Sequence, residues 1–187
     1  MGQYYKIVTR KAGKTTVYNR SIKGVGEYVL AKRLEHSWWE NPTCNALAAS
    51  LVDNPQKVCW CGDYAEPDET KALGFDYEQV WGGDVKGQEI DPAPEGFSLD
   101  TLDFLVNKDK KLFVDLRQYR ADSTGKDGWC IFPLSILASL GNGRGNGDYE
   151  GSDMELVGSW AFDTVYFSNR TPPKSYRKIH VSFKESR

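Results

Sequence analysis

The chain has 187 residues, of which 40% are hydrophobic, 13% aromatic and 27% charged. This size and composition are typical of one globular domain and exclude an intrinsically disordered chain. The formal net charge of −2 argues against a generic nucleic-acid-binding protein. No stretch approaches the ~20 apolar residues of a membrane span, and the N-terminus lacks the apolar region of a secretory signal. We therefore expect a cytoplasmic protein with reduced thiols and no membrane partner.

Charge is distributed unevenly along the chain. Residues 1–33 hold eight basic residues (Lys and Arg) and one acidic residue. Residues 34–103 hold three basic and fifteen acidic residues, and residues 104–187 hold thirteen basic and ten acidic residues. The basic first part could neutralise the acidic middle part across the fold. Alternatively, the middle part forms an acidic surface that binds a basic groove on a partner.

The first part of the chain predicts a β-hairpin followed by a helix. Residues 3–9 and 15–20 are rich in aromatic and β-branched residues and flank an Ala-Gly-Lys turn, which indicates a hairpin. Residues 26–41 are compatible with either a helix or an extended segment. Residues 42–54 fit a short helix, because a proline suits its first position and an Asn-Pro pair ends it.

The stretch KVCWCG predicts a buried strand over residues 57–62. Successive side chains of a strand alternate between its faces, so Val58 and Trp60 should lie on one face and Cys59 and Cys61 on the other. A structural zinc site usually takes pairs of cysteines with Cys-x₂-Cys spacing, which this stretch lacks. We therefore interpret the four cysteines as buried free thiols and expect no metal and no cofactor.

The second half of the chain predicts further antiparallel strands. Residues 102–107 and 111–119 flank an Asn-Lys-Asp-Lys turn and indicate a second hairpin. Residues 159–169 and 175–183 predict two more strands, which an Arg-Thr-Pro-Pro segment connects.

The elements together predict one α+β domain over residues 1–187. Its sheet should be mainly antiparallel, with one or two short helices and long loops rich in Gly, Pro and acidic residues. A long surface loop is expected over residues 82–98, which are rich in Gly, Pro and acidic residues. No internal repeat and no domain linker is visible.

The most distinctive stretch is GNGRGNGDYEG, residues 141–151, which follows the apolar run IFPLSILASL. It lacks the Lys-Ser/Thr of a P-loop and follows no convincing strand, so it is not a nucleotide-binding fingerprint. Its successive backbone N–H groups could form an anion nest with Arg144 at the centre. The alternatives are a surface loop anchored by Tyr149 and a cation site, although the acidic residues do not have EF-hand spacing. The candidate ligand- or partner-binding residues are Trp60, Tyr64, Asn142, Gly143, Arg144, Gly145, Asp148 and Tyr149.

Three residues are candidates for proton transfer: His36, Glu35 and Asp63. His36 stands between Glu35 and a pair of tryptophans that could desolvate it, although a histidine beside aromatic residues is more often structural. Asp63 follows the predicted strand directly, where it could act as a functional carboxylate or cap the next segment in an Asx turn. If these residues form a site, His36, Asp63 and Arg144 should lie in one cleft.

Three stretches are notable in combination: LEHSWWEN (34–41), VCWCGDYAE (58–66) and FPLSILASLGNGRGNGDYEG (132–151). Together they resemble a group of small proteins carried by bacteria, their phages and other mobile elements. In that group a His is expected before Pro133, where this chain has Phe132. If that His is catalytic in the group, this protein lacks it. The resemblance implies no particular reaction, but it implies a mobile-element setting, in which small proteins often inhibit host defence, anti-CRISPR proteins among them.

Three functions are compatible with these patterns. The first is a binding or inhibitor protein whose acidic middle, tryptophans and Gly-rich loop bind a protein partner, such as a nucleic-acid-binding protein or nucleoprotein. The second is a small enzyme or ligand-binding protein for a nucleotide, nucleic acid or other phosphorylated compound, which Arg144 and the loop would hold. The third is a structural loop held by an internal pair of Asp63 and Arg144. We favour the first function, and direct binding of nucleic acid stays open.

Overall fold

A computed structural model of the protein describes residues 3–27, 37–83, 85, 87–145 and 148–184. The described residues form ten β-strands and five α-helices. The strands are β1 (Tyr5–Lys11), β2 (Lys14–Ile22), β3 (Gly26–Glu27), β4 (Gln56–Gly62), β5 (Gln88–Ile90), β6 (Phe104–Asn107), β7 (Leu112–Asp115), β8 (Ser139–Leu140), β9 (Asp163–Ser168) and β10 (Arg177–Lys178). The helices are α2 (Pro42–Leu51), α3 (Pro67–Ala72), α4 (Glu78–Trp81), α5 (Leu116–Ser123) and α6 (Pro133–Leu137).

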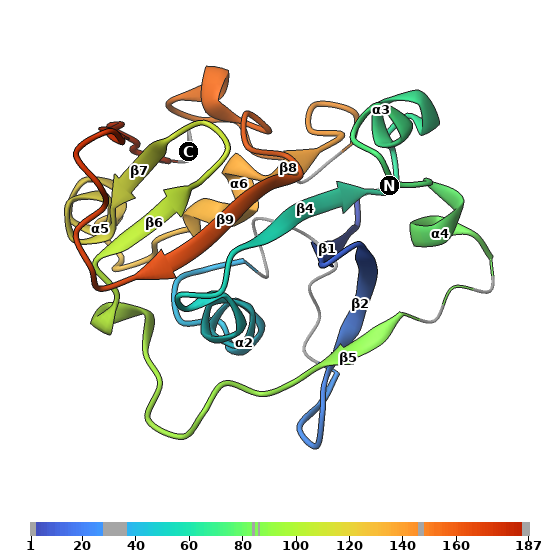
Figure 1. Ribbon diagram of the computed structural model, residues 1–187, viewed down its shortest axis with the longest axis horizontal. Coiled ribbons are helices and arrows are strands. Elements are labelled where there is room, and N and C mark those ends of the chain that lie inside the picture. Colours follow the sequence, from blue (N-terminus) through green and yellow to red (C-terminus); the bar gives the residue numbers. More distant parts are fainter. Residues whose placement is uncertain (1–2, 28–36, 84, 86, 146–147, 185–187) are drawn as a thin grey trace.

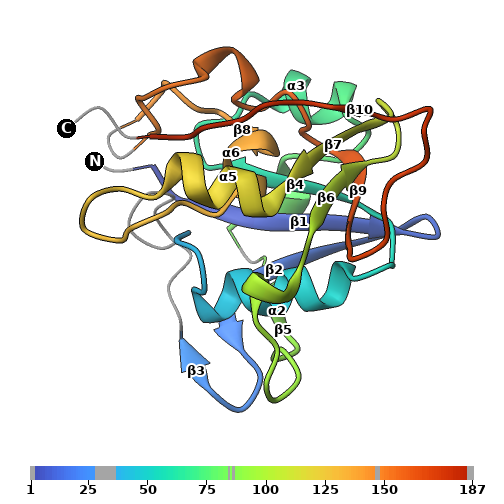
Figure 2. The same cartoon turned by 90° about the vertical axis from the view of Figure 1, so that its left-hand side faces the viewer.

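All ten strands belong to one sheet (Figure 1). Their order is β10-β7-β6-β9-β4-β1-β2-β3, with β5 beside β2 and β8 beside β4. Six neighbouring pairs are antiparallel, and the three parallel pairs are β2–β5, β4–β8 and β7–β10. The ribbon of β2 and β3 projects from the body of the molecule at the lower edge of Figure 2. The predicted α+β fold with a mainly antiparallel sheet is therefore confirmed.

The described residues contain five short helices, where the sequence predicted one or two. α2 lies in the predicted range, and Asn41 Oδ1 caps it by accepting a hydrogen bond from Thr43 N at 2.9 Å. Three of the additional helices, α3, α5 and α6, begin where a proline or a side-chain cap fixes the first turn. In α3, which begins at Pro67, Glu66 N donates to Glu69 Oε2 at 3.0 Å. Helices this short contain too few apolar residues at helical spacing to be predicted from the sequence.

Three predicted strands are shorter than expected. The strand predicted over residues 111–119 ends at Asp115, because Asp115 Oδ1 accepts a hydrogen bond from Gln118 N at 3.1 Å and starts α5. β9 begins at Asp163, because Phe162 has a φ of +59° that interrupts an extended backbone. Of the strand predicted over residues 175–183, only the pair that forms β10 joins the sheet.

A hydrophobic core lies on each face of the sheet. The larger core packs α2, α5 and α6 against one face, and α5 and α6 lie behind β6, β7 and β9 in Figure 1. The smaller core packs the segment of α3 and α4 against the opposite face of β1 and β4. β4 contributes to both, because Val58 and Trp60 lie in the larger core and Cys59 and Cys61 in the smaller one. The predicted alternation along this strand is confirmed.

We expect the four cysteines, all buried and free, to be unreactive in the folded protein. Burial raises the pKa of Cys61 to about 12 and that of Cys130 to about 11, and it also raises the pKa values of Cys44 and Cys59. The thiolate is the reactive form, so an aromatic disulfide reagent at about pH 8 should label almost no thiol before denaturation and all four after it. Rapid labelling of any cysteine in native buffer would contradict this burial.

Candidate functional site

The Gly-rich loop closes around one of its own carboxylates. The backbone N–H groups of Gly143, Arg144 and Gly145 donate to Asp148 Oδ2 at 2.7, 2.9 and 3.0 Å. From β1, the hydroxyl of Tyr5 donates to Asp148 Oδ1 at 2.7 Å. The backbone groups that the sequence suggested as an anion nest do converge on an anion, but that anion belongs to the chain itself.

Arg144 is held by the first turn of α3. Its guanidinium lies 3.2 Å from Glu66 Oε1 and 2.9 Å from Glu69 Oε1, and Nη1 donates to the Tyr64 carbonyl oxygen at 3.2 Å. These contacts replace the internal pair with Asp63 that the sequence suggested. The guanidinium therefore fastens the loop to α3, while its side chain stays 37% exposed.

Tyr149 anchors the end of the loop, as one interpretation of the sequence expected. Its N–H donates to Asn142 Oδ1 at 2.9 Å, and Asn142 Nδ2 donates back to the Tyr149 carbonyl oxygen at 3.3 Å. The Tyr149 hydroxyl lies 2.7 Å from the Ser152 carbonyl oxygen and 3.0 Å from that of Lys184. Asp148 and Tyr149 are both buried, so their side chains build the loop and present no surface to a partner.

Two glycines bring the loop and the end of β4 together around Gln3. Gly141 has a φ of +92°, and a Cβ there would lie 2.8 Å from Gln3 Nε2. A Cβ on Gly62 would lie 2.1 Å from the same atom. Gln3 is fully buried, and its Nε2 has no hydrogen-bond partner among the described residues. The glycines at these two positions therefore allow the protein to approach itself closely.

The end of β4 places three candidate residues in different environments. Trp60 is fully buried in the larger core, so it stabilises the fold and is no contact for a partner. Asp63 is partly exposed, and its Oδ1 accepts a hydrogen bond from Tyr4 N at 3.0 Å, which ties it to the start of β1. Tyr64 points outwards and is 39% exposed. Of the three, Tyr64 offers the largest accessible side chain.

The three stretches that carry the resemblance meet at Phe132. Its N–H donates to the Ser37 carbonyl oxygen, of the first stretch, at 2.7 Å. Its ring centre lies 6.0 Å from that of Trp60, of the second stretch, and 5.9 Å from that of Phe167. Phe132 is 0% exposed, so the position at which the resemblance implies a His is an apolar core position in this protein.

The cleft expected from His36, Asp63 and Arg144 is described only in part. His36 and Glu35 lie outside the described residues. Asp63 and Arg144 lie on adjoining segments, because Arg144 donates to the carbonyl oxygen of Tyr64. The second and third stretches therefore meet at the surface, where Tyr64 and Arg144 are accessible.

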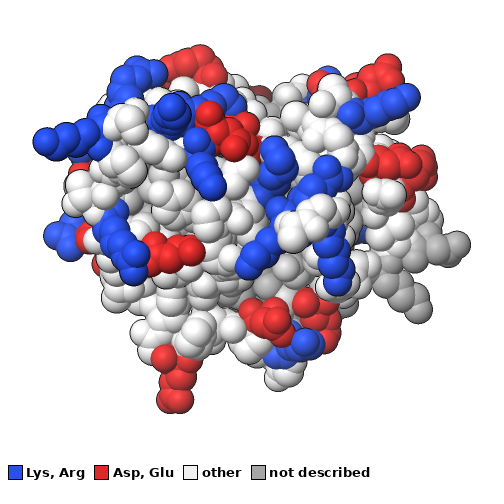
Figure 3. Space-filling view, viewed as in Figure 1, with Lys and Arg blue, Asp and Glu red and all other residues white. Residues whose placement is uncertain are grey.

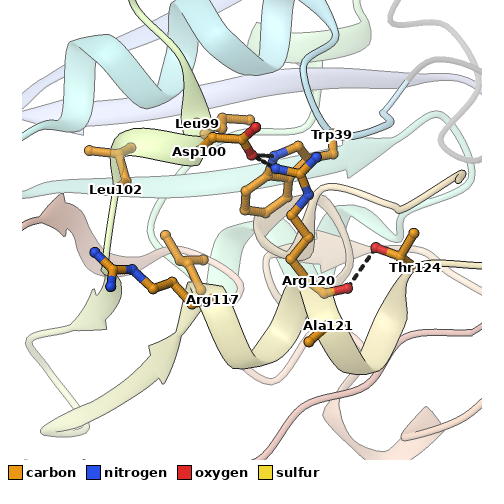
Figure 4. A pocket seen from close by; sticks show the side chains of 9 residues that line it. Trp39, Leu99, Asp100, Leu102, Arg117, Arg120, Ala121 and Thr124 are labelled. Carbon is orange, nitrogen blue, oxygen red and sulfur yellow. Dashed lines mark hydrogen bonds and ion pairs between the residues drawn. The ribbon is translucent and has the colours of Figure 1, made fainter.

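A hollow outside the expected site lies between Trp39 and α5 (Figure 4). Trp39 Nε1 donates to Asp100 Oδ1 at 2.8 Å, and Arg120 pairs with the same carboxylate. The Arg120 guanidinium lies 5.6 Å from the Trp39 ring centre, within the range of a cation–π contact. The cavity has a volume of about 380 Å³, and its lining comprises Trp39, Leu99, Asp100, Leu102, Leu116, Arg117, Arg120, Ala121 and Thr124.

The lining of this hollow combines apolar side chains with the charged groups of Asp100, Arg117 and Arg120. The Thr124 hydroxyl, also in the lining, donates to the Arg120 carbonyl oxygen at 2.6 Å. The sequence alone did not indicate Asp100 and Arg120, because they lie far from Trp39 along the chain. The pair of tryptophans at 38–39 was the one signal that pointed to this region.

Comparison of the chain with known protein families, curated proteins and solved structures finds no match. Within the described ranges, no helix is long and apolar enough to cross a membrane. In the same part of the chain, no three His, Cys, Asp or Glu side chains are grouped so that they could hold a metal ion.

Proposed function

We propose that the protein is a binding protein that acts on a protein partner through the surface where the Gly-rich loop meets α3. This binding surface is defined by Tyr64, Glu66, Asp68, Glu69 and Arg144. The observation that carries the proposal is the contact between Asp148 and three loop N–H groups. Because the donors of Gly143, Arg144 and Gly145 are satisfied within the chain, this part of the loop is preformed, and preformed surfaces bind protein partners at a low entropic cost.

The same contact argues against phosphate binding by the loop, the second function that the sequence allowed. A phosphate group would have to displace the Asp148 carboxylate from three backbone donors and from the Tyr5 hydroxyl. It would also meet Glu66 and Glu69, which already pair with Arg144. Two carboxylates beside the guanidinium repel a second anion.

The partner that fits this surface is a basic protein. Glu66 and Asp68 are exposed, Glu69 is partly exposed, and Arg144 is the cation among them. Tyr64 stands beside them as an exposed aromatic side chain, the residue type that often dominates protein interfaces. Basic grooves that accept such acidic surfaces occur on nucleic-acid-binding proteins and nucleoproteins.

The sequence resemblance favours a more specific role for such a binding protein. In that role it inhibits a nucleic-acid-binding host-defence protein, as anti-CRISPR proteins do. The four free thiols favour a reducing compartment and therefore a cytoplasmic setting. In this role the chain needs no catalytic group, and its activity depends on the charge and shape of the binding surface.

A site-specific crosslinker tests the proposal. A photoreactive phenylalanine analogue at Tyr64, irradiated in a bacterial lysate, should capture one basic protein. The same analogue at Val52, which is 36% exposed near the opposite end of β4, should not capture it. With the purified partner, Asp68→Lys should weaken binding at least about tenfold, because it reverses an exposed charge in the binding surface. Salt of about 1 M should have a similar effect.

The matched control is Glu95→Lys, which makes the same charge change on an exposed loop residue outside the binding surface. Equal weakening by both variants would contradict a local interface. A nucleotide that raises the melting temperature of the wild type but not of Arg144→Ala would instead support phosphate binding by the loop.

A further inference from the structure

The sheet face opposite the larger core carries three aromatic side chains on neighbouring strands. In the register of the sheet, Val106 on β6 lies opposite both Phe113 on β7 and Tyr166 on β9. Residues directly opposite each other share a face of the sheet, and Phe104, two positions from Val106, lies on that face too. We call this the aromatic face and define it by Phe104, Phe113 and Tyr166.

The three rings of the aromatic face are partly exposed. Phe104 and Phe113 are in edge contact, with ring centres 5.6 Å apart. Burial raises the pKa of Tyr166, and Tyr176 and Asp53 add to the effect. α5 and α6 lie behind these strands in Figure 1, so the aromatic face points towards the viewer there and in Figure 3.

Basic side chains surround the aromatic face. Lys57 lies opposite Thr164 and Lys178 opposite Phe113, which places both on this face of the sheet. Figure 3 shows Lys and Arg side chains around a largely uncharged surface on the side of β6, β7 and β9. Three exposed lysines at the ends of these strands and in the segment before β10 form no ion pair with a described carboxylate: Lys108, Lys111 and Lys174.

The two lysines placed on this face by the register each form an ion pair with an aspartate. Lys57 lies 3.6 Å from Asp109, and Lys178 lies 2.9 Å from Asp115. Thr164 N donates to Asp109 at 2.8 Å. Both aspartates are therefore occupied by the fold, and the three unpaired lysines leave the face with a positive field.

From this combination we infer that the aromatic face binds single-stranded nucleic acid. Partly exposed aromatic rings can stack with unpaired bases, and the surrounding lysines neutralise phosphates. A duplex fits this surface less well, because its bases are stacked inside and cannot reach rings that lie in a sheet. From β10 to β4 the face spans four strand spacings, about 19 Å, which suits an extended strand. This inference uses no residue of the binding surface and does not depend on the proposed partner.

Fluorescence anisotropy with labelled oligo-dT and oligo-U of about 12 nucleotides tests the inference. Tyr166→Leu should weaken binding about tenfold, because it keeps an apolar side chain and removes a stacking ring, whereas Tyr166→Phe should bind like the wild type. The pair Lys108→Gln and Lys111→Gln should lower the slope of log affinity against log salt by about 1.4, since each phosphate contact on a single strand contributes about 0.7. The pair Lys71→Gln on α3 and Lys126→Gln after α5, both exposed and outside the aromatic face, is the matched charge control and should change neither quantity.

Several results would overturn the inference. One is the absence of oligonucleotide binding by the wild type at low salt. A second is binding of a DNA duplex as tight as that of the single strands and equal in Tyr166→Leu. A third is equal or tighter binding of poly-glutamate, which would show a general affinity for acidic polymers. Thermal unfolding of each variant must match that of the wild type, and Phe104→Leu, which removes another ring of the aromatic face, retains the test if Tyr166→Leu is less stable.

Discussion

Replacing Asp148 with alanine should lower the free energy of unfolding by about 3–5 kcal/mol and open the Gly-rich loop. Asp148 is 7% exposed and accepts hydrogen bonds from three backbone N–H groups and from Tyr5. Removal of the carboxylate leaves these buried donors without their acceptor, and each unsatisfied group costs about 1–3 kcal/mol, although the costs are not additive. Urea denaturation measures the loss of stability, and amide hydrogen exchange at residues 143–145 reports the opening.

Two further variants separate the contributions to this effect. Tyr5→Phe removes one donor and leaves the loop contacts in place, so it should cost only about 1 kcal/mol. Asp148→Asn keeps one acceptor oxygen and should fall between the two. If Asp148→Ala were as stable as Tyr5→Phe and its loop amides exchanged no faster than in the wild type, the carboxylate would not be what holds the loop.

Phe132→His should destabilise the protein by about 3 kcal/mol near neutral pH and by more as the pH falls. The ring of Phe132 is fully buried between Trp60 and Phe167, so the change removes apolar contacts and buries a polar imidazole. An apolar site lowers the pKa of an imidazole below its value of about 6.5 in the unfolded chain. The unfolded state then binds the proton more tightly, and stability decreases as the pH falls below about 6.5.

Denaturation midpoints between about pH 5 and pH 8 check this prediction. Phe132→Leu is the control, because it keeps an apolar side chain, should cost less and should add no new pH dependence. An imidazole at this position that left stability unchanged would show that the junction of the three stretches accepts a polar group. The core would then be able to hold the His that the resemblance implies before Pro133.

The two proposed surfaces lie on different parts of the sheet. The binding surface adjoins the end of β4, and the aromatic face covers β6, β7 and β9. A nucleoprotein offers both kinds of partner, a basic protein groove and a nucleic acid strand. Asp68→Lys and Tyr166→Leu therefore test two contacts that can succeed or fail separately.

The local sequence pattern was sufficient to predict those elements whose backbone is constrained by a single turn or cap residue. The Ala-Gly-Lys turn fixed the first hairpin, and Asn41 with Pro42 fixed the start of α2. The alternation of KVCWCG predicted which side chains of β4 face each core. The α+β class and the buried thiols followed from the same reasoning, because both depend on composition and period.

Tertiary structure decided everything that depends on contacts between distant residues. The nest around Asp148 is formed partly by Tyr5, which is 143 positions away, and Arg144 pairs with α3 across 75 positions. Trp60 was a candidate contact residue, but its side chain lies in the larger core and is fully buried, so it reaches no partner. The aromatic face arises from the register of three strands, and a sequence of negative net charge did not indicate it. Period and composition determine which residues are buried, whereas strand order and register determine which buried or exposed residues meet.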